Sequence, residues 1–275
     1  MAEFVGAFGV PHTPGFPALV EREGQSSETA QLYQAILDQL LDLRVDVLVV
    51  FDSDHLNSFF LDNLPALCIP VAADARGPND SVPSLPERLV RLQPQLGMHM
   101  VDYLTRGQFD VSRSHHLSLD HSLMVPLHFL DPENRFQVLP IYINGLVPPL
   151  ISSLRAHSLG ECVIKTIAEW DSESRVAIIA SGSFSLEVGG PRISDDGISG
   201  VPDPEWVLHV ADRLKKGAIS KLIDEATTER MLRAGNVGGE LLNWIALLGT
   251  VGDKPCRFLE LQTQFGHGYA SWEVL

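Results

Sequence analysis

Cysteine, basic residues and long apolar runs are all scarce in this chain of 275 residues. Its three cysteines, Cys68, Cys162 and Cys256, lie far apart and fit no zinc-binding spacing, which indicates reduced core thiols and no disulfide framework. Lysine and arginine number 20 against 35 acidic residues, a formal net charge of -15. Because no basic stretch could neutralise phosphates, this composition argues against a nucleic-acid partner and against an anionic membrane surface.

The apolar runs and the first residues bear on cellular location. No run approaches the roughly 18–20 apolar residues that span a bilayer. Residues 1–15 (MAEFVGAFGVPHTPG) lack the basic region that opens a secretory signal. Together with reduced thiols, these features predict a cytoplasmic protein. With 45% hydrophobic and 20% charged residues and no evident linker, we expect one globular domain over residues 1–275.

Apolar strand patterns alternate with helical patterns along the chain, which predicts an α/β fold whose mostly parallel or mixed central sheet is flanked by helices. Strands are expected at residues 3–10, 45–51, 67–72, 109–114, 136–144, 175–181 and 256–264. Helices are expected at residues 26–43, 86–104 with a kink or break at Pro94, 121–130, 151–170, 204–216, 219–226, 228–233 and 239–248. Residues 73–83 and 182–192 are expected to be loops, and residues 193–204 a mobile segment.

Histidines stand where expected strands give way to polar turns. The strand at 45–51 is apolar at almost every position, as in a sheet covered on both faces, and His55 follows it. His12 and His121 occupy similar junctions. In open α/β sheets, ligand sites lie just past the carboxyl ends of such strands. These histidines are therefore candidates for one shared site, although His12 alone would also suit an exposed turn.

Two histidines and one carboxylate on one face of a metal form the pattern of non-haem Fe(II) oxygenases. The residue pattern alone does not choose the carboxylate; the candidates are Asp52, Asp54, Asp120, Glu187 and Glu240. Glu240 follows a glycine-rich turn and opens an apolar helix, a position that the helix dipole would also explain. Three nitrogen and oxygen ligands with open positions would equally suit a zinc- or manganese-dependent hydrolase.

Five segments resemble the class III extradiol ring-cleavage dioxygenase superfamily, which contains the protocatechuate 4,5-dioxygenase β subunit and the 2,3-dihydroxyphenylpropionate dioxygenases. They are PHTP around His12, FDSDHLNSFF around His55, LDHSLMVPL around His121, VLPIYINGLVPPL around Ile141, and AGNVGGELLNW around Glu240. They cover most of the chain in the family's order. The resemblance implies an enzyme that uses Fe(II) and O2 to open the ring of a catechol-type substrate beside its diol, inserting both oxygen atoms.

The resemblance also implies roles for individual residues. His12, His55 and Glu240 would be the iron ligands, and His121 an acid/base facing the substrate. Asp54 would orient His55, as carboxylates often do at ligating histidines. Asn57 would line the same pocket.

One position departs from the family. Leu186 stands in the loop GSFSLEVGGPR, where the family keeps a second acid/base histidine. Three explanations stay open. Another side chain substitutes, the candidates being His115, His116, His267 and Tyr269. The substrate needs only one such group, and Leu186 shapes an apolar pocket. Or the chain is a weakened or non-catalytic relative.

Substrate contacts and partners are less constrained. Arg192 could pair with a substrate carboxylate, or it could be a surface charge. His267 and Tyr269 could form an apolar wall with Phe184 and Leu186. On family grounds we expect a homo-oligomer, with a small partner subunit as the alternative. A non-catalytic binding or scaffold protein of the same fold, such as the Memo family, is the alternative function.

Overall fold

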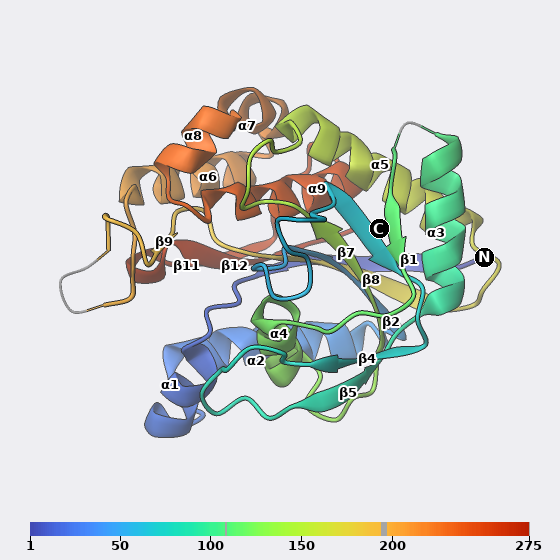
Figure 1. Ribbon diagram of the computed structural model, residues 1–275, viewed down its shortest axis with the longest axis horizontal. Coiled ribbons are helices and arrows are strands. Elements are labelled where there is room, and N and C mark those ends of the chain that lie inside the picture. Colours follow the sequence, from blue (N-terminus) through green and yellow to red (C-terminus); the bar gives the residue numbers. More distant parts are fainter. Residues whose placement is uncertain (108, 194–196, 275) are drawn as a thin grey trace.

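A mixed eight-stranded sheet runs through the computed structural model, which describes residues 1–107, 109–193 and 197–274 (Figure 1). Its four central strands are parallel and neighbours in the order β1 (Glu3–Val10), β8 (Arg175–Ser181), β2 (Val47–Asp52) and β7 (Gln137–Ile143). Parallel strands bring their carboxyl ends to the same edge, so the segments after Val10, Ser181, Asp52 and Ile143 leave the sheet together.

Antiparallel pairs close both flanks of the sheet. Beyond β7, β3 (Leu67–Pro70) is antiparallel, and β6 (Ser112–Ser114) pairs parallel to β3. Beyond β1, β12 (His267–Trp272) is antiparallel and carries β11 (Phe258–Gln262) at the outer edge. The prediction of an α/β fold with a mixed sheet is confirmed.

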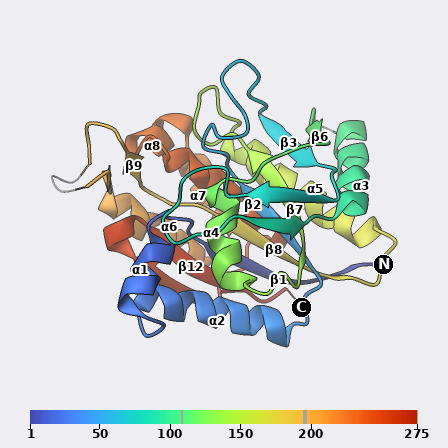
Figure 2. The ribbon, with the colours of Figure 1, turned by 60° about the horizontal axis from the view of Figure 1, so that its bottom comes forward.

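Helices cover both faces of the sheet, as Figures 1 and 2 show from two directions. Along β2, Val47, Val49 and Phe51 enter one apolar cluster, whereas Leu48 and Val50 enter the other. The first cluster packs α3 (Pro94–Arg106), α5 (Ser153–Glu169), α6 (Pro204–Lys216), α7 (Ile219–Glu225), α8 (Thr228–Arg233) and α9 (Leu241–Val251). The second packs α1 (Phe16–Glu23), α2 (Glu28–Asp42), α4 (His121–Leu130) and the hairpin of β4 (Asp74–Gly77) and β5 (Arg88–Arg91). A strand buried on both faces explains why its sequence shows no alternation.

Helices α5 and α9 approach closely because small residues face each other between them. A Cβ built on Gly160 would lie 1.9 Å from the carbonyl oxygen of Ala246, and one on Gly249 would lie 2.0 Å from that of His157. The contact therefore joins backbone to backbone. It holds α9, and with it the turn that precedes α9, against the sheet.

Two expectations about local structure were wrong. The helix expected over residues 86–104 is a strand, β5, followed by α3, because Pro94 sits in the first turn of α3 and starts the helix instead of kinking it. Residues 73–83, expected to be a loop, contain β4. The segment 193–204, expected to be mobile, lies partly outside the described residues; of it the structure describes β10 (Ser199–Gly200), which pairs with β9 (Glu187–Val188). In the described ranges, no helix combines the length and the apolar character that a bilayer crossing requires.

Candidate metal centre

Three imidazoles converge at the carboxyl edge of the parallel strands. His12 follows β1, His55 follows β2, and His121 opens α4. Their ring centroids lie 5.1 Å apart for His12 and His55, 5.7 Å for His12 and His121, and 4.2 Å for His55 and His121, the last pair being stacked. One nitrogen from each ring lies within 4.8 Å of the other two, a spacing that a single metal ion could bridge.

Glu240 points into the same space. Its Oε1 lies 3.1 Å from Nε2 of His12 and 3.0 Å from Nε2 of His55, while Oε2 accepts the backbone N–H of Ser183 at 2.8 Å. Glu240 ends the short 3-10 turn η1 (Gly238–Glu240) and is fully buried. Glycine permits this approach, since a Cβ on Gly182 would lie 2.8 Å from the Cβ of Glu240.

The outer nitrogens of His12 and His55 are already engaged. The hydroxyl of Ser181 donates to the carbonyl of Ser122 at 2.8 Å, so its oxygen accepts the Nδ1–H of His12 at 2.8 Å. The Nδ1–H of His55 donates to Oδ2 of Asp120 at 3.1 Å. When neutral, both rings therefore turn the lone pair of Nε2 toward Glu240.

A cation is needed where these lone pairs meet. Oε1 of Glu240 and the two Nε2 lone pairs that face it, at 3.1 and 3.0 Å, repel one another unless a proton or a metal ion lies among them. Burial would raise the pKa of Glu240, but His12 and His55 lower it well below its usual range. Burial likewise would lower the pKa of His55, but Asp120 and Glu240 raise it well above its ordinary value. The negative charges that favour a proton on His55 would equally favour a metal cation bound among these three side chains.

Asp120, not Asp54, is the carboxylate that holds His55. Oδ2 of Asp120 accepts both the backbone N–H of His55 at 2.9 Å and its Nδ1–H. The carboxylate of Asp54 instead accepts the backbone N–H groups of Asn57, Ser58 and Phe59 and closes the turn after His55. The prediction for Asp54 was wrong because successive side chains in this turn point in different directions.

Of the five carboxylates that the sequence offered, Glu240 alone faces both His12 and His55 in the described part of the chain. Asp52 is fully buried, and burial, with Asp120 adding to it, raises its pKa well above the ordinary value. Its Oδ2 accepts the hydroxyl of Ser122 at 3.0 Å. A carboxyl group that resists ionisation is a poor metal ligand.

Asp80, which no sequence pattern singled out, holds His121. Its Oδ1 accepts the backbone N–H of His121 at 3.1 Å, and its Oδ2 forms a short hydrogen bond with Nδ1 of the same residue. Burial and the charge of His55 lower the pKa of His121, against the effect of Asp80. Asp80 lies in a loop of glycine, proline and polar residues, where a carboxylate carries no local signal. The side chain of Asn57 donates to Asp80 at 3.4 Å and to Asp120 at 3.3 Å, which places it at the same site.

The residues predicted to form a substrate wall divide into two groups. Tyr269 is fully buried, packs edge-on against Tyr33 and donates to Oε1 of Gln262 at 3.3 Å, so it occupies the core and not a substrate wall. His267 is also buried, with Nε2 bonded to Gln262 at 3.2 Å, but the charges of His12 and Glu240 reach it. Burial first, and then His12, lower the pKa of His267 to about 3. It is therefore neutral near neutral pH and lies within range of the charges of His12 and Glu240.

Arg192 is occupied elsewhere. Its Nη2 pairs with the buried Glu187 at 2.6 Å, and its Nη1 donates to the carbonyl of Arg233 at the end of α8, also at 2.6 Å. Glu187 in turn accepts the backbone N–H of Asn236 at 2.9 Å. The predicted partner of a substrate carboxylate instead fastens the loop after β8 to α8. Leu186 lies half-buried in that loop, with its carbonyl accepting the N–H of Val237.

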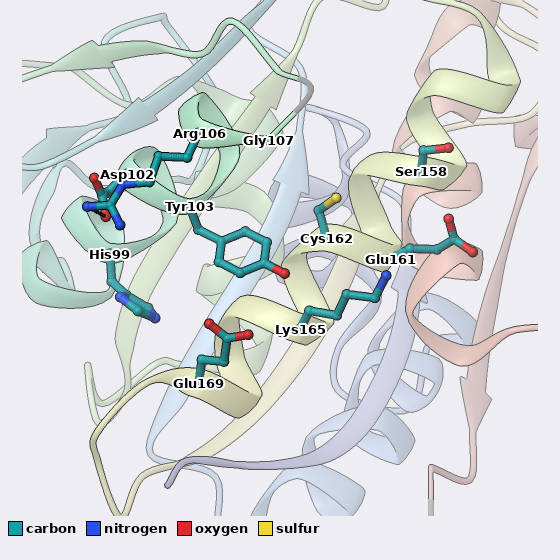
Figure 3. A pocket seen from close by; sticks show the side chains of 10 residues that line it. All are labelled: His99, Asp102, Tyr103, Arg106, Gly107, Ser158, Glu161, Cys162, Lys165 and Glu169. Carbon is teal, nitrogen blue, oxygen red and sulfur yellow. Dashed lines mark ion pairs between the residues drawn. The ribbon is translucent and has the colours of Figure 1, made fainter.

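A separate groove of about 570 Å³ lies between α3 and α5 (Figure 3). Figure 3 shows Tyr103 of α3 opposite Cys162 and Lys165 of α5. Within the described residues, none of those that line it is a predicted site residue. Its position on the helical face separates it from the carboxyl edge where the histidines meet.

Comparisons with known proteins give the family of this chain. Over residues 6–271 the chain matches the family described as the catalytic LigB subunit of aromatic ring-opening dioxygenase. It is 29% identical over 169 residues to the 2,3-dihydroxyphenylpropionate/2,3-dihydroxicinnamic acid 1,2-dioxygenase of Paraburkholderia xenovorans (strain LB400), covering 61% of this chain and 52% of that one. A protein of the same name from Paraburkholderia phymatum is 27% identical over 246 residues, which cover 75% of each chain.

The match thus spans about half the length of the first of these relatives. The crystal structure of an uncharacterized protein from Escherichia coli K12 superposes with a TM-score of 0.61 at 12% identity, covering 97% of this chain and 98% of that one, which shows a shared fold. Because the family match extends over residues 6–271, from β1 to β12, the chain belongs to the family described as the catalytic LigB subunit of aromatic ring-opening dioxygenase.

Proposed function

We propose that this chain is a non-haem Fe(II)-dependent extradiol dioxygenase, which opens the aromatic ring of a catechol-type substrate with O2. The observation that carries the proposal is the convergence of Nε2 of His12 and Nε2 of His55 on Oε1 of Glu240, at 3.1 and 3.0 Å. Two histidines and a carboxylate on one face, with other positions open, are typical of non-haem Fe(II) oxygenases. Membership of a ring-opening dioxygenase family supports the same reading.

In this proposal His12, His55 and Glu240 hold the iron. Ser181 and Asp120 fix the tautomers of the two imidazoles, so that each presents a lone pair to the metal. Bound there, Fe(II) supplies a template that brings the diol oxygens and O2 together and lets charge pass between them. The buried Glu240 completes the ligand set from the start of α9.

His121 is the proposed acid/base. Its Nδ1 is engaged by Asp80, which leaves Nε2 as the nitrogen that takes a proton from a substrate hydroxyl or returns one later. The ring stacks on His55 at a centroid distance of 4.2 Å, so a diol bound beside His55 lies within its reach. Asp80 acts through His121 by fixing the orientation of the ring.

We infer that His121 works without a second acid/base group. Leu186 cannot move a proton, and His115 and His116 are exposed beside β6. His267 is buried, with a pKa of about 3, so it stays neutral and cannot act as an acid near neutral pH. This favours a substrate whose ring opening needs one proton-transfer residue.

Reconstitution with Fe(II) under anaerobic conditions tests the proposal. The full chain should bind one equivalent of iron, consume O2 with at least one catechol, and release a yellow ring-fission product. Glu240→Gln should lose both iron and O2 uptake, whereas the exposed His116→Ala should keep both. A chain that binds no iron, or that takes up no O2 with any catechol, would refute the assignment. Turnover with Zn²⁺ and no O2 uptake would identify a hydrolase instead.

A further inference from the structure

Solvent reaches the metal centre from the side of His55, His121 and Asp80. The side chains of His12 and Glu240 are 4% and 1% exposed, whereas those of His55, His121 and Asp80 are 15%, 11% and 19% exposed. A small molecule therefore reaches the centre past His55, His121 and Asp80. The residues around that opening decide which substituents on the ring are tolerated.

The loops around this opening carry acidic groups and almost no basic ones. The segments that leave the carboxyl edge, or bring side chains to it, are residues 11–15, 53–66, 78–83, 115–120, 144–152, 182–192, 234–240 and 263–266. They contain six carboxylates: Asp54, Asp62, Asp80, Asp120, Glu187 and Glu240. The single lysine or arginine among them is Arg192.

Arg192 is not available to a ligand. It pairs with Glu187, whose side chain is 3% exposed, and it also donates to the carbonyls of Arg233 and Leu232 at 2.6 and 3.3 Å. Turning it toward a substrate would leave Glu187 as a buried, uncompensated charge, which is costly. An anion that enters past His55, His121 and Asp80 would therefore meet the carboxylate of Asp80, and these segments offer it no lysine or arginine other than the engaged Arg192.

We propose that the substrate is a catechol whose ring substituent is neutral or positively charged, and that carboxylated catechols are disfavoured. This inference rests on the proposed function and adds the charge class of the substrate. It separates this chain from the relatives named for 2,3-dihydroxyphenylpropionate, which is a carboxylic acid. At an effective dielectric of about 20, one unpaired like charge within several ångströms suffices for roughly tenfold discrimination.

Equilibrium binding to the iron-loaded, oxygen-free full chain tests this inference. Three catechols are compared, carrying an ethyl, an aminoethyl or a carboxymethyl group at the same ring position. Each displaces a coloured nitrocatechol, so the readout does not depend on turnover. The ethyl and aminoethyl compounds should bind at least about tenfold more tightly than the carboxymethyl compound. Added salt should reduce the difference in affinity between the aminoethyl and carboxymethyl compounds, which both carry a charge.

Arginine variants test whether Arg192 binds a substrate carboxylate or only pairs with Glu187. Arg192→Ala and Arg192→Lys should leave the ratio of carboxymethyl to ethyl affinity unchanged, as should the matched control Arg233→Ala on α8. A carboxymethyl compound that binds as tightly as the ethyl compound overturns the inference while the proposed function stands. If both Arg192 variants lose affinity for the carboxymethyl compound alone, the inference is likewise overturned while the proposed function stands. If none of the three binds and O2 is not consumed, the proposed function fails and the inference falls with it.

Discussion

Replacing Asp120 by Asn should weaken iron binding far more than it weakens the fold. Oδ1 of Asp120 accepts the backbone N–H of Ser122 and so caps α4, while Oδ2 accepts two donors from His55 and one from Asn57. Asn is as good a helix cap as Asp, so the cap survives if the amide oxygen takes the Oδ1 position. The amide NH2 then replaces Oδ2, so the two donors of His55 and the side-chain amide of Asn57 face a donor where they had an acceptor.

The consequence falls on the metal-facing nitrogen of His55. With an N–H donor opposite, Nδ1 of His55 can keep a hydrogen bond only by giving up its proton, which moves to Nε2 and covers the lone pair that faces Glu240. Loss of such a carboxylate partner typically costs 10–100-fold in metal affinity, about 1.4–2.7 kcal/mol. Competition with a metal-sensitive dye measures the affinity, and thermal unfolding of the metal-free protein measures the fold.

Asp54→Asn is the matched control, since it removes a buried carboxylate from the same turn. It should lower the unfolding temperature by loosening the turn after His55 and change iron affinity by less than about threefold. Equal iron affinities for Asp120→Asn and the unchanged chain would refute the reasoning. So would a loss of affinity confined to Asp54→Asn.

Three further outcomes follow from the structure. Asp80→Asn should lower kcat about 10²-fold or more with little change in KM, because it disturbs the orientation and proton of His121 and not diol binding; steady-state O2 uptake measures both. Folding lowers the pKa of His267 from its ordinary value to about 3, so the unfolded chain binds a proton that the folded chain does not. The free energy of unfolding should therefore drop as pH falls below about 6.5, by up to 1.4 kcal/mol per pH unit. His267→Asn should flatten this slope in urea titrations at a series of pH values. Gly160→Ala should cost about 1–3 kcal/mol by pushing α5 from α9, whereas Gly15→Ala, with open space around its Cβ, should change stability little.

Strands buried on both faces were the most predictable elements. The predicted bounds of β1 and β8 agree with the structure because continuous apolar runs between polar turns admit no other assignment. The hairpin of β4 and β5 was missed because its short strands carry exposed charges and no apolar run. β12 was missed because its pairing partner β1 lies at the other end of the chain, and local sequence carries no record of such pairing.

Within the site, residue type was predictable and direction was not. His12 and His55 follow buried strands and were predicted at one edge of the sheet, where the structure places them. His121 reaches the same edge by another route, at the start of α4 after the exposed β6. From the sequence alone, Asp54 and Asp120 are equally plausible hydrogen-bond partners for His55. The structure shows that Asp120 accepts the Nδ1–H of His55, whereas Asp54 accepts backbone N–H groups of the turn. Arg192 stayed open between a substrate contact and a surface charge, because the sequence carries no pattern for its salt bridge to Glu187 on the same loop.

The distance along the chain between the partners of the metal centre has a kinetic consequence. His12 and Glu240 are separated by 228 positions, and Ser181, which sets the tautomer of His12, comes 169 positions after it. Closing loops of that length is slow, because the loss of chain entropy is offset only after the elements within the loop have packed. In the proposed function, iron can bind only after segments near both ends of the chain have folded together, so iron uptake during refolding would report the completion of folding.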